Sequence, residues 1–174
     1  AAANYSTPKI YRNNIGYTPT ITITGSLTAL EKCESSASSY QTLTLSGSSL
    51  TSNVSVPTNT HLEYSIDAGS TWNSSLSIAP SSGIVSETLL VRAKAGVTSD
   101  VSTTSFSISS TGATSLSVGY QVDVLDPTAV SSQPADAQVC IGGTDPTLSV
   151  TATGDNLTYQ WYSNNTNATT GGTS

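Results

Sequence analysis

Apolar and polar residues alternate with a period of two through most of residues 20–125. The clearest run is the last, where the apolar residues share one parity: Leu116, Val118, Tyr120, Val122 and Val124. Successive side chains of a strand point to opposite faces, so each such run predicts a half-buried β-strand. No window has the i, i+3, i+4, i+7 spacing of an amphipathic helix. The pattern predicts about eight short strands and an all-β fold.

Turn signals separate these runs every 8–12 residues or so, which is typical of an antiparallel β-sandwich. Asp67–Ser70 and Ser110–Ala113 have the composition of turns, and Pro57 and Pro80 end the strands before them because proline cannot donate to a central ladder. The alternation predicts a core that includes Leu43, Leu45, Tyr64, Ile66, Val91, Phe106, Val118 and Val122.

The chain also repeats itself once. The stretch from Cys33 to Thr51 aligns without a gap on the stretch from Cys140 to Thr158, 107 positions later. A period this long indicates tandem domains, since solenoid repeats run about 20–50 residues. Only 34 residues follow Cys140, so we expect the second domain to be incomplete. We divide the chain into a leader or linker (1–18, with a possible strand at 9–11), a sandwich (19–125), a linker (126–134) and the N-terminal part of a second sandwich (135–174).

The amino-acid composition of the chain limits the classes of partner that it can bind. Charged residues make up 9% of the chain and the formal net charge is −6. The five cations are scattered rather than clustered as a phosphate backbone requires, which argues against nucleic acid: Lys9, Arg12, Lys32, Arg92 and Lys94. No apolar run approaches the roughly 20 residues of a membrane span.

The second copy carries the most specific motif, QPADAQVCIGG followed by LSVTATGDNLTYQWY. It resembles the immunoglobulin-like repeats of very large secreted proteins of gliding and related Bacteroidetes. The matching positions are Gln133, Pro134, Cys140, Gly142, Val150, Gly154, Leu157 and Tyr159 to Tyr162. The first domain, through YSIDAGSTW and SSTGATSLSVGYQVDV, resembles a companion module of the same proteins.

The resemblance implies tandem immunoglobulin-like β-sandwiches, with Trp161 as the structural tryptophan of strand C. It also implies type IX secretion, a secreted, cell-surface location, and roles as adhesins, gliding-type filaments or spacers in secreted hydrolases. The usual strand-B cysteine position is occupied by Val150, so the disulfide of antibody-type domains is not carried over. We expect Cys33 to be a small buried hydrophobic residue. A bridge to Cys140 requires Cα atoms within about 7 Å, which tandem domains rarely offer.

Catalytic and metal-binding patterns are weak. A triad requires a histidine oriented by a carboxylate and an activated serine, and we interpret the single histidine, His61, as a strand-edge residue. Glu63, Asp67 and Glu87 are the available carboxylates for glycoside hydrolysis, and we expect them to be solvated. Calcium between the domains would use aspartates, for which the weak candidates are Asp123, Asp126 and Asp145. Trp72 and Tyr162 are weak candidates for stacking on sugar rings.

The sequence therefore predicts a non-catalytic structural or adhesive repeat region of a large bacterial surface protein, without a cofactor. The expected partners are neighbouring repeats, and surface glycans or secretion-machinery proteins. One alternative is a spacer or carbohydrate-binding module of a secreted hydrolase. A third hypothesis is strand exchange, in which the second sandwich accepts a strand such as Lys9–Tyr11 from another chain.

Overall fold

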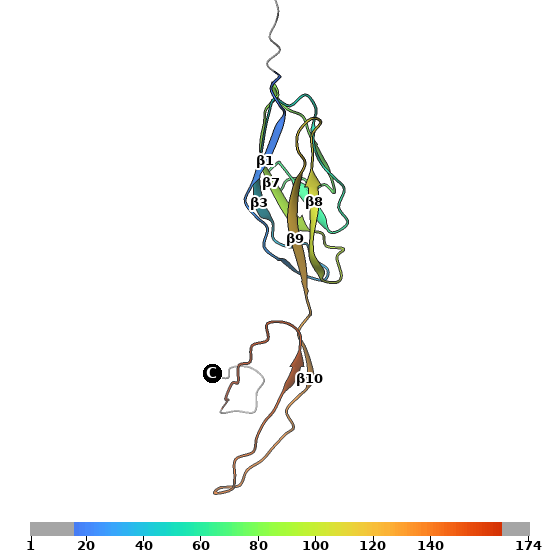
Figure 1. Cartoon of the computed structure of the whole chain (residues 1–174). Helices are drawn as coiled ribbons and strands as arrows, with labels where there is room; N and C mark the ends of the chain where they lie inside the picture. Colours follow the sequence, from blue (N-terminus) through green and yellow to red (C-terminus); the bar gives the residue numbers. More distant parts are fainter. Residues whose placement is uncertain (1–15, 165–174) are drawn as a thin grey trace, which may run out of the picture.

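The computed structural model describes residues 16–164, so the strand considered at Lys9–Tyr11 lies outside the described range. This part of the chain has strands and turns but no helix, which confirms the all-β prediction. Figure 1 shows an elongated molecule in which a two-layered sandwich is followed by a smaller β unit. The sandwich strands are β1 Thr20–Thr24, β2 Leu30–Cys33, β3 Gln41–Ser48, β4 Val54–Val56, β5 Leu62–Ser65, β6 Leu76–Ile78, β7 Val85–Ala93, β8 Val101–Ile108 and β9 Leu116–Leu125. The smaller unit contains β10 Ala129–Ser132 and β11 Thr151–Thr153.

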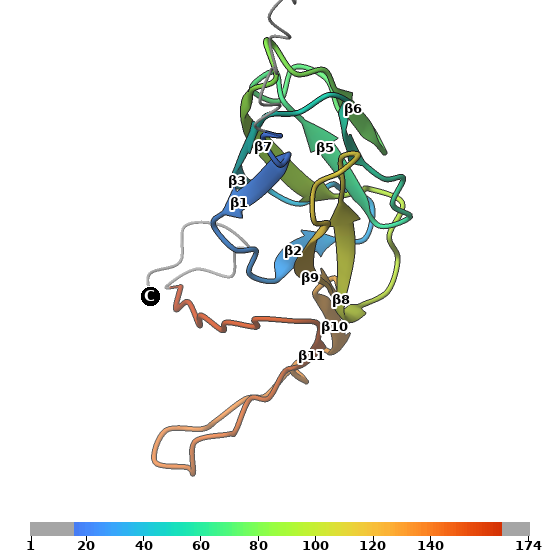
Figure 2. The ribbon, with the colours of Figure 1, turned by 45° about the horizontal axis from the view of Figure 1, so that its top comes forward.

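The sandwich has one sheet in each layer. The first sheet is antiparallel, with strand order β1-β3-β7-β5, and the second has the order β2-β9-β8 (Figure 2). The β4-β6 pair continues the second layer beyond β8 through a bridge between Ser55 and Ser109. Among the described strands, β2 and β9 pair in parallel and the other neighbouring strands pair antiparallel. A single apolar cluster draws residues from both layers, as a sandwich core does.

The chain changes layer between β1 and β2, and Gly25 makes this possible. Its φ of +98° lies in the region that favours glycine. A Cβ at this position would lie 3.3 Å from both the Leu43 side chain and the Thr42 carbonyl oxygen. After the crossover, β2 pairs with the second half of β9, from Val122 to Leu125. The sequence pattern did not reveal β2, because one of its two inward residues is a lysine.

Seven of the eight predicted core residues are buried, which confirms that their side chains belong to the core: Leu43, Leu45, Tyr64, Val91, Phe106, Val118 and Val122. The eighth, Ile66, is 37% exposed, and its assignment to the core was wrong. Strand β5 ends at Ser65, whose hydroxyl oxygen is buried and accepts hydrogen bonds from the Asp67 and Gly69 backbone N–H groups. The turn therefore begins one residue earlier than the alternation suggests, and it carries Ile66 to the outer face of the sheet.

Burial along β2 corrects the expectation for Cys33. Leu30 and Lys32 point inward and are 1% and 3% exposed, so Glu31 and Cys33 face outward. Cys33 is exposed rather than buried. The ammonium group of Lys32 donates hydrogen bonds to the backbone oxygens of Glu34 (2.8 Å), Ala95 (3.3 Å) and Val97 (2.6 Å). A buried cation is tolerated here because three carbonyl groups replace its water shell.

Each unit begins with a pair of strands, β1 with β3 and β10 with β11, in which corresponding residues lie opposite each other. In the sandwich, Ile23 of β1 pairs with Leu45 of β3. In the smaller unit, Val130 of β10 pairs with Ala152 of β11, and each residue lies 107 positions after its counterpart. The register then shifts by one residue, so that Ser132 pairs with Thr151. Strand β10 falls inside the segment 126–134 that the sequence suggested as a linker.

The same glycine also makes the same close approach in both units. A Cβ on Gly47 would lie 3.3 Å from the Thr20 carbonyl oxygen, and one on Gly154 would lie 2.8 Å from the Pro127 carbonyl oxygen. Gly154 and Pro127 again stand 107 positions after Gly47 and Thr20. The repeat in the sequence thus has a counterpart in backbone geometry.

Replacing Lys32 by methionine should destabilise the sandwich. Methionine fills similar space but leaves the three carbonyl oxygens without a donor, and an unsatisfied buried polar group costs about 1–3 kcal/mol. We expect urea unfolding to report a loss of about 2 kcal/mol. Glu31→Gln, on the exposed side of the same strand, is the control. Equal stabilities of the Lys32→Met and Glu31→Gln variants would show that the buried ammonium contributes nothing.

Candidate functional site

His61 belongs to a hydrogen-bond network rather than to a triad. Its Nδ1 lies 3.0 Å from the Tyr120 hydroxyl oxygen. Asn59 organises the same corner, because its side-chain oxygen accepts from the His61 and Leu62 backbone N–H groups and its amide nitrogen donates to the Tyr120 hydroxyl. The ring partner of His61 is therefore a tyrosine, whereas a catalytic triad uses a carboxylate at that place.

The three candidate carboxylates of the sandwich occupy separate settings. Glu63 forms an ion pair with Arg92, with 2.6 Å between Oε1 and Nε. Asp67 accepts hydrogen bonds within its own turn from the Ser65 hydroxyl (2.6 Å), the Thr71 hydroxyl (2.6 Å) and the Thr71 N–H (3.0 Å). Glu87 lies on β7 opposite the core residue Leu45 of β3, so its half-buried side chain is on the core-facing side of the sheet. The turn and the ion pair give Asp67 and Glu63 structural partners of their own.

Hydrogen bonding changes the acidity of Asp67. The Ser65 hydroxyl, followed by the Thr71 hydroxyl and N–H, stabilises the charged carboxylate and lowers the pKa of Asp67 to about 2. Asp67 is thus ionised over the whole physiological range, and its role in the structure is to hold the turn after β5.

The aspartates considered for calcium are not brought together. The side chain of Asp123 accepts a hydrogen bond from Gln121 Nε2 at 2.7 Å. Asp126 instead contributes its backbone N–H, which donates to Asp155 Oδ2 at 2.7 Å. Asp145 is exposed in the segment between β10 and β11. Within residues 16–164 no group of three or more His, Cys, Asp or Glu side chains is placed to hold a metal ion.

Trp72 is part of a row of side chains that the sequence did not reveal. The Arg92 guanidinium lies 3.9 Å from the centre of the Trp72 ring and stacks on one face of it. The Tyr40 ring follows, with its centre 6.2 Å from that of Trp72. Trp72 is half-buried while Tyr40 is 55% exposed. These residues come from β7, the loop after β5 and the residue before β3, so only their pairing in three dimensions could have identified the row.

The aromatic residues of the smaller unit are exposed. Trp161 and Tyr162 have 53% and 66% of their surface accessible, and Tyr159 has 56%. Tyr159 and Trp161 line a groove of about 280 Å³, together with Gln133, Pro134 and Val150. Trp161, which the resemblance implies to be the structural tryptophan of strand C, is therefore not buried among the described residues.

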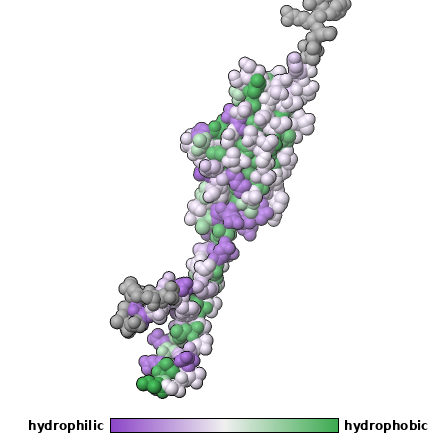
Figure 3. Space-filling model, turned by 90° about the vertical axis from the view of Figure 1, so that its left-hand side faces the viewer, coloured by the Kyte–Doolittle hydropathy of each residue, from purple (hydrophilic) through white to green (hydrophobic). Residues whose placement is uncertain are grey.

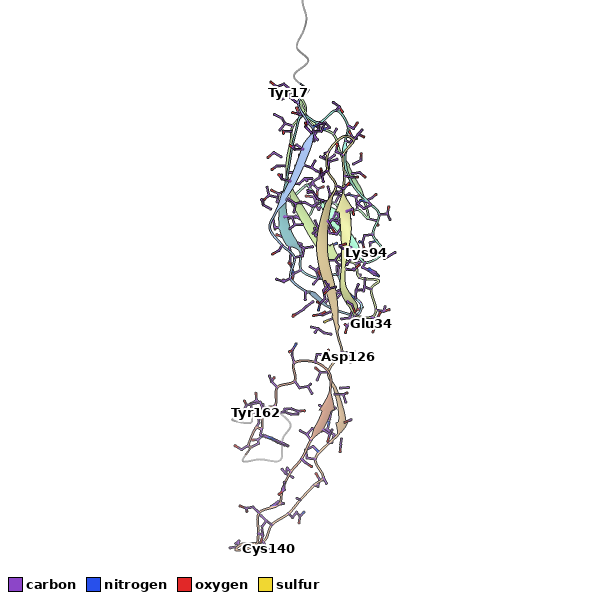
Figure 4. All side chains as sticks on the ribbon, viewed as in Figure 1. Tyr17, Glu34, Lys94, Asp126, Cys140 and Tyr162 are labelled. Atoms are coloured by element: carbon purple, nitrogen blue, oxygen red, sulfur yellow. The ribbon has the colours of Figure 1, made fainter. Side chains whose placement is uncertain are left out.

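Both cysteines are free and exposed. Cys140 lies in a turn at the far end of the smaller unit, where the Gly143 N–H donates to its carbonyl oxygen (2.8 Å). Cys33 ends β2 and immediately precedes Glu34, at the end of the sandwich that faces the smaller unit (Figure 4). The length of the smaller unit separates the two thiols, so they form no bridge.

The junction between the two units is short, and hydrogen bonds fix the backbone at both of its ends. Strand β9 ends at Leu125 and β10 begins at Ala129, with only Asp126–Thr128 between them. On the sandwich side, the Val124 N–H donates to Asp100 Oδ1 at 2.8 Å. On the other side, Asp126 and Asp155 are joined by two hydrogen bonds, of 2.7 Å to the Asp155 side chain and 3.3 Å from the Asp155 N–H. Figure 3 shows hydrophilic residues gathered at this end of the sandwich.

Comparison with known proteins gives no assignment. No family model, curated protein or solved structure matches the chain. Among residues 16–164 there is also no helix with the length and apolar character needed to cross a membrane.

The acidity of Asp67 predicts a pH dependence. Its folded pKa of about 2 lies below the usual value of about 4, so its stabilising contribution is complete above about pH 4 and is lost as the pH falls toward 2. Asp67→Asn should therefore be less stable than the natural protein at pH 5, and the difference should shrink at pH 2.5. Urea unfolding at both pH values measures this difference in stability, and Asp145→Asn is the control. A difference that does not depend on pH would contradict the assignment.

Proposed function

We propose that this chain is a non-catalytic structural region of a large bacterial surface protein, in which stiff β-sandwich units repeat and hold other parts of the protein away from the cell. The observation that carries the proposal is the repeated strand pair. Two residue pairs of β10 and β11, Ala129 with Thr153 and Val130 with Ala152, stand 107 positions after equivalent pairs of β1 and β3. Repeats of this length are arrays of domains.

The order of strands supports an immunoglobulin-like sandwich. Such domains place the first, second, fifth and fourth strands in one sheet and the remaining strands in the other. Here the order β1-β3-β7-β5 in one layer and β2-β9-β8 in the other fits that plan when β2 and β6 are counted as additional segments of the second layer. The β4-β6 pair beyond β8 is compatible with the same arrangement.

The junction supports a mechanical role. Linkers of domain arrays bend when they are long and flexible, whereas here three residues connect β9 to β10. Asp126 within this connection donates its backbone N–H to Asp155, and Val124 at the end of β9 donates to Asp100. Gly154 allows the second unit to approach the Pro127 carbonyl oxygen closely. A connection of this kind transmits orientation from one unit to the next.

Composition and the motif resemblance support the proposed location. A chain with abundant serine and threonine, 9% charged residues and a net charge of −6 fits an exported surface protein. Because the chain resembles repeats of Bacteroidetes surface proteins, the proposal also includes type IX secretion and a role in an adhesin or gliding-type filament. The alternative, a spacer in a secreted hydrolase, shares the same mechanics and differs in the domains that flank the region.

Gly154→Ala tests the junction. An alanine Cβ would lie 2.8 Å from the Pro127 carbonyl oxygen and the Thr128 Cα, and the backbone φ of +123° disfavours any side chain. We expect the β10–β11 pair to separate, with at least tenfold faster hydrogen exchange of the amides in β10. Gly96→Ala is the control, since its Cβ would meet nothing within 4 Å. Unchanged exchange in β10 would show that the glycine does not hold the junction.

A further inference from the structure

The outer face of the first sheet carries a groove of about 480 Å³ that the proposed structural role does not use. Strands β3 and β7 form its floor, where Leu90 is buried although it faces away from the core. The loop after β5 makes one wall through Ile66 and Ala68. Tyr40 stands at the margin with half of its surface accessible. The volume lies within the range of ligand sites, about 300–1000 Å³.

Tyr40 belongs to a row of supported side chains. Glu63 holds Arg92 through the 2.6 Å ion pair, Arg92 stacks on Trp72 at 3.9 Å, and Trp72 lies beside Tyr40 at 6.2 Å between ring centres. One face of Trp72 is occupied by Arg92, so Tyr40 is the more accessible ring. An aromatic ring held in this way loses little freedom when a ligand binds, which favours affinity.

The loop wall is strained. Ala68, which lines the groove, has a φ of +57°, a conformation that non-glycine residues adopt at some cost. Ser65, Asp67 and Thr71 hold this turn through their mutual hydrogen bonds. Strain that the surrounding structure maintains is frequent at ligand sites. The turn also places Ile66 at the groove instead of in the core.

Polar groups surround the aromatic and aliphatic surface. The hydroxyl-bearing residues Thr42, Ser86 and Thr88 line the same groove. Hydroxyl groups both donate and accept hydrogen bonds. Pyranose rings present an apolar face of C–H groups and a rim of hydroxyl groups. The net charge of −6 disfavours anionic ligands.

We propose that this groove binds an uncharged pyranose glycan, with one sugar ring stacked on Tyr40 and its hydroxyl groups exchanging hydrogen bonds with Thr42, Ser86 and Thr88. The site is independent of the proposed array function, because it uses only residues of the first sandwich. In an array it would add glycan contact to a unit that otherwise acts as a spacer.

The test is binding of defined oligosaccharides to the full chain. A panel of uncharged tetrasaccharides built from glucose, mannose, galactose or N-acetylglucosamine, and sulfated or uronic-acid tetrasaccharides for comparison, is screened by saturation-transfer NMR. Affinity for any binder is then measured by calorimetry. We expect at least one uncharged tetrasaccharide to bind and the anionic ones not to bind. A panel without an uncharged binder, or one in which only anionic sugars bind, overturns the proposal.

Variants locate the site. Tyr40→Ala should weaken binding at least tenfold, Tyr40→Phe should retain it because the ring remains, and Thr88→Val should weaken it several-fold. Tyr17→Ala removes a tyrosine that is 77% exposed outside the groove and serves as the matched control. Tyr40 is exposed, so its replacement should leave the unfolding midpoint unchanged, which thermal unfolding checks. Equal affinities of the Tyr40→Ala and Tyr17→Ala variants would place the glycan elsewhere and contradict the proposal.

Discussion

Burial of one face of β9 is the constraint on which the rest of the structure depends. Val118, Tyr120 and Val122 alternate inward along this strand and are at most 6% exposed. A slip of one residue would turn them all toward water, so the hydrophobic effect specifies the register strongly. That register positions β8 on one side and β2 on the other. The strand then continues directly into the junction, so the core of the first unit also orients the start of the second.

Close backbone approach is the second constraint, and it is shared by both units. Gly47 faces the Thr20 carbonyl oxygen and Gly154 faces the Pro127 carbonyl oxygen, at distances where a Cβ would be crowded or excluded. In each unit the glycine lies near the end of the second strand of the pair or just after it, and the carbonyl lies at or just before the start of the first. The glycines retained by the sequence repeat therefore have a steric reason, which composition alone does not reveal.

Much of the sandwich could be predicted from the sequence, because each strand that buries one face repeats apolar residues with a period of two. Strand β9 and the core positions on β3 and β7 are examples. The prediction was wrong at two polar residues that are buried. Ser65 ends β5 by holding the following turn, which displaces Ile66 from the core, and Lys32 points inward from β2 while Cys33 lies outside. These reversals depend on hydrogen bonds to distant carbonyl groups or within a turn, and a one-dimensional pattern carries no sign of them.

The candidate sites were less predictable for the same reason. The sequence singled out Trp72, but the row that includes Arg92 and Tyr40 forms only when β7 and the loop after β5 come together. Asp126 was considered as a calcium ligand, and its contribution at the junction is instead a backbone donor to Asp155. Both cases show that residue type suggests a chemistry, whereas the fold decides which atom of the residue is presented.

The central claim is that the two units are held in one orientation by the short junction. Spin labels on the natural Cys33 and on a cysteine introduced at Thr151, with Cys140 replaced by serine, report the distance between the units by pulsed electron resonance. Both positions are exposed and lie on strands, one in each unit. The account predicts a single narrow distance distribution that is independent of ionic strength. A broad distribution, of the width expected for freely jointed units, would contradict it.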